Sequence, residues 1–193
     1  MNTFTVPTRA LKAAAKMAAN DPARVPLNQV YIDRHGVYAS DSYTAYRYEL
    51  DLPTLEDRVI AFPAELFKSI KVGKTVNPAI FEEIKDGLWH VDTLSANSDI
   101  YAQEFEFERA SNHTLNKNIA RLFNEHVSGE KGSLGLGVKY LSKIIAAAKI
   151  VNESPNLRFD FQERDTGAIL VKSTNFDPNT SERAEFLIMP VRL

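Results

Sequence analysis

The sequence predicts an α+β fold, in which helices pack on antiparallel sheets. Stretches rich in good helix formers are followed by runs of β-branched and aromatic residues, and the order strand, helix, strands recurs three times at a period of about 60 residues. Turn signals between successive strand-like runs indicate hairpins, which join antiparallel strands.

The first unit consists of a helix and two strands. Pro7 precedes TRALKAAAKMAAND, where Thr8 can cap the N-terminus of the helix and Asn20-Asp21-Pro22 stop it. Two strand-like runs follow in QVYIDRHGVYASDSYTAYRYELDL, and Arg34-His35-Gly36 between them predicts a hairpin turn.

The second and third units repeat this order. RVIAFPAELFKSIKVGK predicts a short strand and then a helix that begins near Pro63 and ends near Gly73. Strands follow in AIFEEIKDGLWHVDTL, with a turn at 85–87, and in IYAQEFEFE. The third unit begins with GSLGLGVKYLSKIIAAAKIV, which predicts a helix. LRFDFQERDTGAILVKST then predicts a hairpin with its turn at 165–167, and the terminal strand follows.

A polar segment separates the second unit from the third. ASNHTLNKNIARLFNEHVSGEKG contains Ile119, Leu122 and Phe123, so it is either a helix of the second domain or a linker that packs on its neighbours. We place a domain boundary near residue 110, which divides the chain into residues 1–110 and a shorter domain of residues 111–193.

Composition limits the class of protein. The chain has 193 residues, of which 44% are hydrophobic and 25% charged, which is typical of a globular protein. Its net charge of −2 shows that its surface is not uniformly basic. A basic stripe is still compatible with this net charge, because acidic residues elsewhere can balance it. The absence of cysteine excludes disulfides and thiolate sites. No segment has the apolar length of a signal peptide or a membrane span, so we expect a soluble, cytoplasmic protein.

The predicted helices share a cationic face. Their basic residues recur at helical spacing and include Arg9, Lys12, Lys16, Lys68, Lys71, Lys74, Lys139 and Lys143. A single such face is usually only solvated. If all the helices faced the same way, however, their lysines would form a surface that binds phosphates without reading the base sequence.

Catalytic motifs are weak. Asp165-Thr166-Gly167-Ala168 matches the D-T-G-A of aspartic proteases, but only one copy is present and charged residues precede it, so a hairpin turn is the better interpretation. Glycines 132, 135 and 137 lack the Gly-Lys-Ser/Thr ending of a phosphate loop. A hydrolase triad around Asp41-Ser42 lacks a G-x-S-x-G elbow.

The histidines do not indicate a metal site. His35, His90, His113 and His126 fall in separate predicted elements without the spacing of metal ligands. We therefore expect no enzyme activity, no cofactor and no metal.

The chain ends on AEFLIMPVRL, where polar residues are more usual. Several segments, this one most closely, resemble the bacterial sliding clamp, the beta subunit of DNA polymerase III. FLIMPVRL is similar to that family's ending, VKYLSKIIAAAK to the helix before it, and LRFDFQERDTGAILVKST to the hairpin between them. FTVPTRALKAAAKMA resembles the start of the middle domain, VIAFPAELFKSI the next strand and helix, and NIARLFN the linker that follows.

The sequence also departs from the family. YASDSYTAYRYEL resembles a strand in which clamps usually show Ala-Thr-Asp-Gly-His-Arg-Leu-Ala, so Ser42, Tyr43 and Thr44 stand in place of Gly, His and Arg. The chain is too short for three clamp domains and has room for one full domain and a shortened second one.

The resemblance implies a DNA-clamp fold, with helices on one face of curved antiparallel sheets, and a non-catalytic processivity factor or adaptor on duplex DNA. The basic helix residues would contact DNA without sequence preference. A chain this short must supply several copies to surround a duplex, so we expect a homo-oligomeric ring. The alternatives are a clamp mimic that binds partner peptides but does not encircle DNA, and a small hydrolase that uses Asp165 or Ser42.

The resemblance also implies a partner site near the C-terminus. In clamps the terminal strand borders an apolar groove, into which a DNA polymerase or another partner inserts a short peptide. Carried over, its walls are Leu187, Met189, Pro190, Val191 and Arg192, facing Ser40, Asp41, Tyr43 and Ala45. Otherwise, the apolar ending only completes a sheet.

Overall fold

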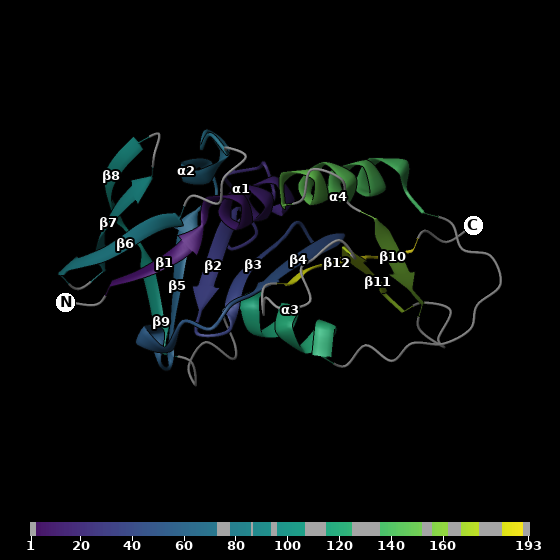
Figure 1. Ribbon diagram of the computed structural model, residues 1–193. Helices are drawn as coiled ribbons and strands as arrows, with labels where there is room; N and C mark the ends of the chain where they lie inside the picture. Colours follow the sequence, from purple (N-terminus) through teal and green to yellow (C-terminus); the bar gives the residue numbers. More distant parts are fainter. Residues whose placement is uncertain are drawn as a thin grey trace.

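Two antiparallel sheets and the helices packed on them make up the computed structural model of the chain (Figure 1). The structure describes residues 3–72, 78–85, 87–93, 96–106, 115–124, 136–151, 156–161, 167–173 and 183–190. Strands from both halves of the sequence share the larger sheet, so the fold is continuous across them.

The larger sheet has eight strands, and each of them pairs antiparallel with its neighbours. Their spatial order is β10 (Leu157–Asp160), β11 (Ile169–Ser173), β12 (Arg183–Ile188), β4 (Thr44–Glu49), β3 (Gly36–Ser40), β2 (Gln29–Asp33), β5 (Arg58–Pro63) and β9 (Gln103–Glu106). The smaller sheet has four strands, in the order β1 (Thr3–Pro7), β6 (Pro78–Lys85), β7 (Leu88–Thr93) and β8 (Ala96–Tyr101).

Helices lie on both faces of the larger sheet. On one face are α1 (Thr8–Met17), α2 (Glu65–Lys68) and α4 (Val138–Val151), which share a core with residues of β12 such as Phe186. Helix α3 (Leu115–Asn124) packs through Ile119 and Phe123 against the opposite face. The three cationic helices therefore share one side of the sheet, whereas α3 lies on the other side, so the expectation of helices on one face holds for all but α3 (Figure 1).

The turn between β2 and β3 forms where the sequence predicts it. Asp33 Oδ1 accepts hydrogen bonds from the amides of His35 at 2.8 Å and Gly36 at 3.1 Å. Gly36 has a φ of 147°, and a Cβ there would lie 2.1 Å from the carbonyl oxygen of Tyr48. Only glycine fits this close approach of two backbones.

Three local expectations were wrong. Helix α1 begins at Thr8 after Pro7, without a side-chain cap, so Thr8 is its first helical residue. Helix α2 is a single turn that ends at Lys68, whereas the sequence predicted a helix that continues to near Gly73. The run IYAQEFEFE is divided between β8 and β9, which belong to different sheets.

The pairing of β12 with β4 joins the two halves of the chain. Across this pair, Arg47 forms an ion pair with Glu185, and its guanidinium lies 4.8 Å from the ring centroid of Phe123 in α3. The predicted boundary near residue 110 lies outside the described residues and stays a prediction. Among the described helices, none has the length and apolar character needed to span a membrane.

Candidate nucleic-acid interface

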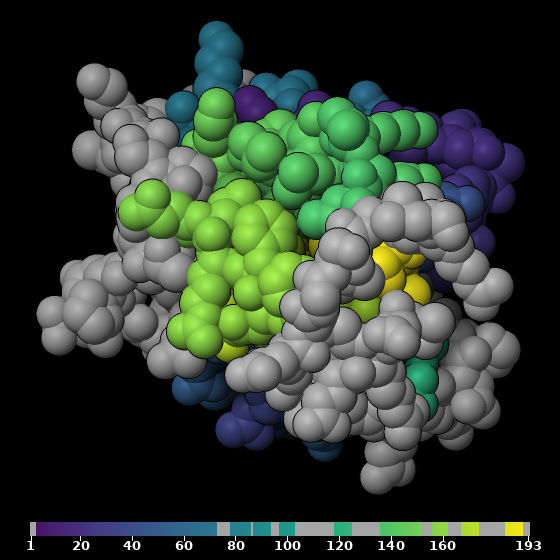
Figure 2. Space-filling view, turned by 90° about the vertical axis from the view of Figure 1, so that its right-hand side faces the viewer, coloured from purple at the N-terminus to yellow at the C-terminus, as the bar shows by residue number. Residues whose placement is uncertain are grey.

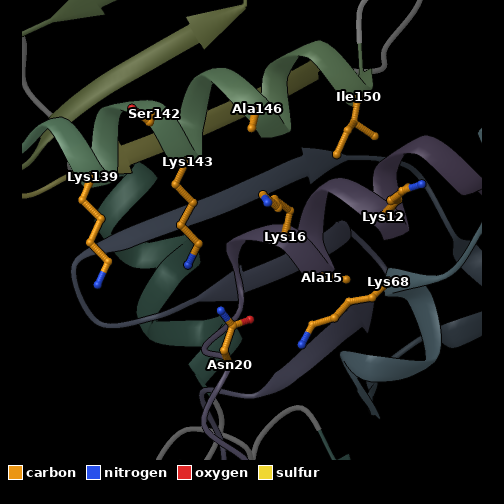
Figure 3. Close-up of a pocket in the computed structure, with 10 residues that line it drawn as sticks. All are labelled: Lys12, Ala15, Lys16, Asn20, Lys68, Lys139, Ser142, Lys143, Ala146 and Ile150. Carbon is orange, nitrogen blue, oxygen red and sulfur yellow. The ribbon is translucent and has the colours of Figure 1, made fainter.

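A groove of ≈ 640 Å³ lies between α1, α2 and α4 (Figure 3). Its lining is rich in lysine and consists of Lys12, Ala15, Lys16, Asn20, Lys68, Lys139, Ser142, Lys143, Ala146 and Ile150. Helices from distant parts of the sequence thus bring five lysines to one hollow, in a chain whose net charge is −2.

The structure separates the other predicted basic residues from this groove. Arg9 is half-buried on α1. Lys71 lines a smaller hollow of ≈ 160 Å³ between α2 and the smaller sheet, because α2 ends before it. Lys74 lies outside the described residues.

Lys143 is bound to the protein itself. Its Nζ donates hydrogen bonds to the carbonyl oxygens of Met17, at 3.0 Å, and Ala18, at 3.2 Å. It also lies 2.5 Å from Asp41 Oδ2. A cation at the last carbonyls of α1 satisfies groups that a helix end leaves open. Lys143 therefore fastens α4 to α1 and to the turn between β3 and β4.

Asp41 shapes that turn. Its Oδ1 accepts hydrogen bonds from the amides of Tyr43 at 3.0 Å and Thr44 at 2.8 Å, and from Thr44 Oγ1 at 2.9 Å. Burial acts to raise the pKa of Asp41, but the hydrogen bonds from Lys143 and Thr44 outweigh it and hold that pKa below its ordinary value. Two residues predicted for different sites, Asp41 for the peptide groove and Lys143 for DNA, thus contact each other.

The remaining groove lysines differ in their hydrogen-bond and ion-pair partners. Lys12 Nζ donates to the carbonyl oxygen of Ile70 at 2.6 Å, which ties α1 to the end of α2. Lys68 pairs with the exposed Glu65 at 2.8 Å. No hydrogen bond or ion pair within the described residues engages Lys16 or Lys139.

Positive charge accumulates in the groove. Burial lowers the pKa of Lys143, Asp41 offsets part of this effect, and the neighbouring charges of Lys16 and Lys139 lower it further. The positive electrostatic potential of these lysines attracts a polyanion. The geometry suits a phosphate backbone better than base edges, because lysines present point charges on flexible stems.

The predicted peptide groove is only partly accessible. Ala45 and Leu187 are buried against α3, and the buried Ser40 donates its hydroxyl to the carbonyl oxygen of Thr44 at 2.8 Å. The two strands lie side by side, since Leu187 pairs with Ala45 and the Met189 amide donates to the carbonyl oxygen of Tyr43 at 3.1 Å.

Of the other predicted wall residues, Tyr43 is 51% and Met189 43% exposed, and Pro190 is half-buried. Val191 and Arg192 lie outside the described residues.

Tyr140, which the sequence analysis did not single out, belongs to the same surface. Its ring stacks on that of Tyr43, with centroids 5.0 Å apart and planes 25° apart. Helix α4, which carries Tyr140 between two groove lysines, lies at the molecular surface (Figure 2). The position of Tyr140 beside Lys139 was the one signal that could have identified it.

The weak catalytic motifs gain no support. Among the described residues, no group of three or more potential metal ligands comes together. His90 Nδ1 lies 2.5 Å from Asp99 Oδ1, and this hydrogen bond raises the pKa of His90. Ser42 Oγ accepts a hydrogen bond from Arg24 at 3.1 Å rather than from a histidine. Asp165, His113 and His126 lie outside the described residues.

Comparison with known proteins identifies the fold. No family model and no curated protein matches the sequence. Among solved structures, DNA polymerase III subunit beta from Borrelia burgdorferi is similar with a TM-score of 0.63 and 11% identity, over 100% of this chain and 65% of that one. The sliding clamp from Pseudomonas aeruginosa has a TM-score of 0.59 and 15% identity, over 99% and 67%. A. fulgidus PCNA, bound to the C-terminal region of FEN-1, has a TM-score of 0.59 and 10% identity, over 100% and 99%.

The chain therefore has the fold of the DNA sliding clamps. The chain is 11% and 15% identical to these two bacterial clamp structures. It covers about two thirds of their length, but nearly all of PCNA.

Proposed function

We propose that the chain is a non-catalytic, clamp-like processivity factor or adaptor that sits on duplex DNA in the cytoplasm. One observation carries this proposal: lysines from α1, α2 and α4, drawn from both halves of the chain, line a single groove. Lys16 and Lys139 have no hydrogen bond or ion pair within the described part of the chain, so their ammonium groups are available to phosphates. Binding of this kind is independent of sequence and sensitive to salt.

The clustering of lysines favours a clamp over a mimic. A mimic that only captures partner peptides has no need for basic residues on helices that share one face of the sheet. A clamp needs them together, because the duplex passes along that face. The fold that the chain shares with the solved clamps also supports this proposal.

Charge reversal tests the proposal. The double variant Lys16→Glu/Lys139→Glu should lose retention on circular duplex DNA, because repulsion replaces attraction at both positions. The control Lys85→Glu/Arg121→Glu changes the charge by the same amount on the smaller sheet and on α3, and it should be retained like the parent protein. Equal retention of both variants would exclude the groove as the DNA surface.

We also propose that copies of the chain associate into a ring. In the described sheet, β9 and β10 are the two end strands, and each pairs with one neighbour. Unpaired edges of this kind can pair with another chain, and a head-to-tail contact closes when the rotation allows it. Mass measurement in solution, with and without DNA, tests this assembly. A strictly monomeric mass at high concentration would contradict the ring and leave the adaptor function standing.

A partner peptide is proposed at the C-terminal end of β12. Met189 is 43% exposed there, and its flexible thioether adapts to different apolar side chains. Pro190, Val191 and Arg192 would complete this surface. Met189→Ser and Val191→Ser, made singly, should weaken binding of a short apolar clamp-binding peptide by about tenfold without a change in melting temperature. Ile80→Ser, an exposed apolar residue on the smaller sheet, is the matched control.

A further inference from the structure

Tyr43 and Tyr140 form a stacked pair that joins the predicted peptide groove to the helix lining the lysine groove. Tyr43 was expected in the wall of the peptide groove, but its ring stacks on α4, the helix that supplies Lys139 and Lys143 to the lysine groove. Tyr43 is 51% exposed, so about half of its surface remains accessible beside the stack.

Cations adjoin this aromatic surface from two segments. Lys139 precedes Tyr140 in α4 and lines the groove. Arg24, from the loop after α1, donates its Nη2 to Ser42 Oγ at 3.1 Å, next to Tyr43 in the chain. The carboxylate of Asp41, which accepts a hydrogen bond from the Tyr43 amide, is paired with Lys143. Exposed aromatic rings beside cations are the features with which proteins bind single-stranded nucleic acid, in which bases stack on the rings and phosphates meet the cations.

The turn holds Tyr43 in a fixed position. Three hydrogen bonds to Asp41 Oδ1 close the turn, and the Met189 amide ties it to the end of β12. Ser42 has a φ of 80°, a left-handed conformation that is uncommon for serine and that the surrounding bonds must maintain. A platform already ordered before binding loses little conformational entropy when a ligand stacks on it.

We infer that Tyr43, supported by Tyr140, stacks an unpaired nucleobase, so that the protein prefers DNA in which a duplex in the lysine groove continues into a single strand. The inference rests on the proposed function, because the groove places the duplex. It assigns Tyr43 to nucleic acid rather than to a partner peptide, since its ring stacks on the lysine-bearing helix and Arg24 binds the adjacent Ser42.

The test compares a blunt hairpin duplex with the same duplex carrying a short unpaired dT extension, using fluorescence anisotropy and the full chain. The extension should tighten binding about fivefold or more, the effect expected of one stacked base. Tyr43→Ala should remove this gain while leaving binding of the blunt duplex unchanged. Tyr43→Phe keeps the ring and should keep the gain, and Tyr101→Ala, an exposed tyrosine on the smaller sheet, is the matched control.

A second readout needs no variant. A 2-aminopurine base at the first unpaired position should lose fluorescence on binding, because stacking quenches it. If the blunt duplex binds but the extension adds nothing, the inference is wrong and the proposed function stands. If neither DNA binds, both fail. If Tyr43→Ala abolishes binding of an apolar peptide and leaves the gain from the extension intact, the surface is a peptide site and the inference is overturned.

Discussion

The lysine groove contains two pairs of lysines that differ in whether their ammonium groups bind the protein itself. Lys12 and Lys143 point into the structure, where their ammonium groups bind main-chain carbonyls and, for Lys143, a carboxylate. Lys16 and Lys139 line the same hollow without such a partner within the described residues. All four lie on neighbouring helices, so position on a helix face does not determine whether a charge is available to a ligand.

The two pairs should therefore have separate roles. Lys12 and Lys143 hold α1 against α2 and α4, which forms the groove. Lys16 and Lys139 provide the charge that faces it. Changes at the first pair are expected to lower the free energy of unfolding, and changes at the second pair to lower the affinity for DNA.

The largest effect on stability is expected for Lys143→Met. It leaves the carboxylate of Asp41, whose side chain is 13% exposed, without its cation, and it frees the last carbonyls of α1. Breaking a buried ion pair from one side costs about 3 kcal/mol. Urea unfolding should show this loss, and the double variant Asp41→Asn/Lys143→Met should recover part of it. No recovery would mean that the ion pair does not couple the two residues.

The same ion pair should make stability depend on pH. The pKa of Asp41 is held below its ordinary value of 3.8, so its stabilising contribution is complete above that value and is lost as the pH falls through the lower folded-state pKa. The parent protein should therefore lose more stability on acidification than Asp41→Asn, in chemical unfolding followed from neutral pH into this acid range. Identical losses in the two proteins would contradict this assignment.

A smaller effect is expected for Lys12→Met. Among the described residues, one hydrogen bond is removed, to the carbonyl oxygen of Ile70, and the half-buried aliphatic stem is kept. A charged hydrogen bond of this kind contributes about 1.5 kcal/mol. The same urea titration measures this loss, which should lie between those of Lys143→Met and Lys16→Met. A loss as large as that of Lys143→Met would show that the ion pair adds nothing to the anchoring of α1.

The smallest effect on stability is expected for Lys16→Met. Lys16 is exposed and has no bonded partner among the described residues, and such a surface side chain contributes less than about 0.5 kcal/mol. DNA affinity should nevertheless fall in this variant, which anisotropy at low salt would detect. If Lys16→Met is as destabilised as Lys12→Met, the distinction between the two pairs fails.

The sequence predicts local features well. Lys12, Lys16, Lys139 and Lys143, grouped by helical spacing, line one groove, the turn at 34–36 forms as expected, and the terminal strand lies beside residues 40–45. These features depend on neighbours within one or two turns, or on a family resemblance at the chain end.

The anchoring of Lys143 could not be predicted in this way. Its carbonyl partners lie 126 and 125 residues away in sequence, and no periodicity encodes such contacts. The same reason explains why the ion pair of Asp41 with Lys143 and the position of α3 on the far face were not predicted. In each case, packing between distant segments decided the outcome.

The slope of DNA affinity against salt concentration tests the central claim, that the lysine groove binds DNA phosphates, most directly. Each phosphate neutralised by a lysine adds about 0.9 to the magnitude of the slope of log K against log salt. Lys16→Gln/Lys139→Gln should therefore lower that magnitude by about 2, while Lys85→Gln/Arg121→Gln leaves it unchanged. A slope that is the same in the parent protein and in both double variants would contradict the claim.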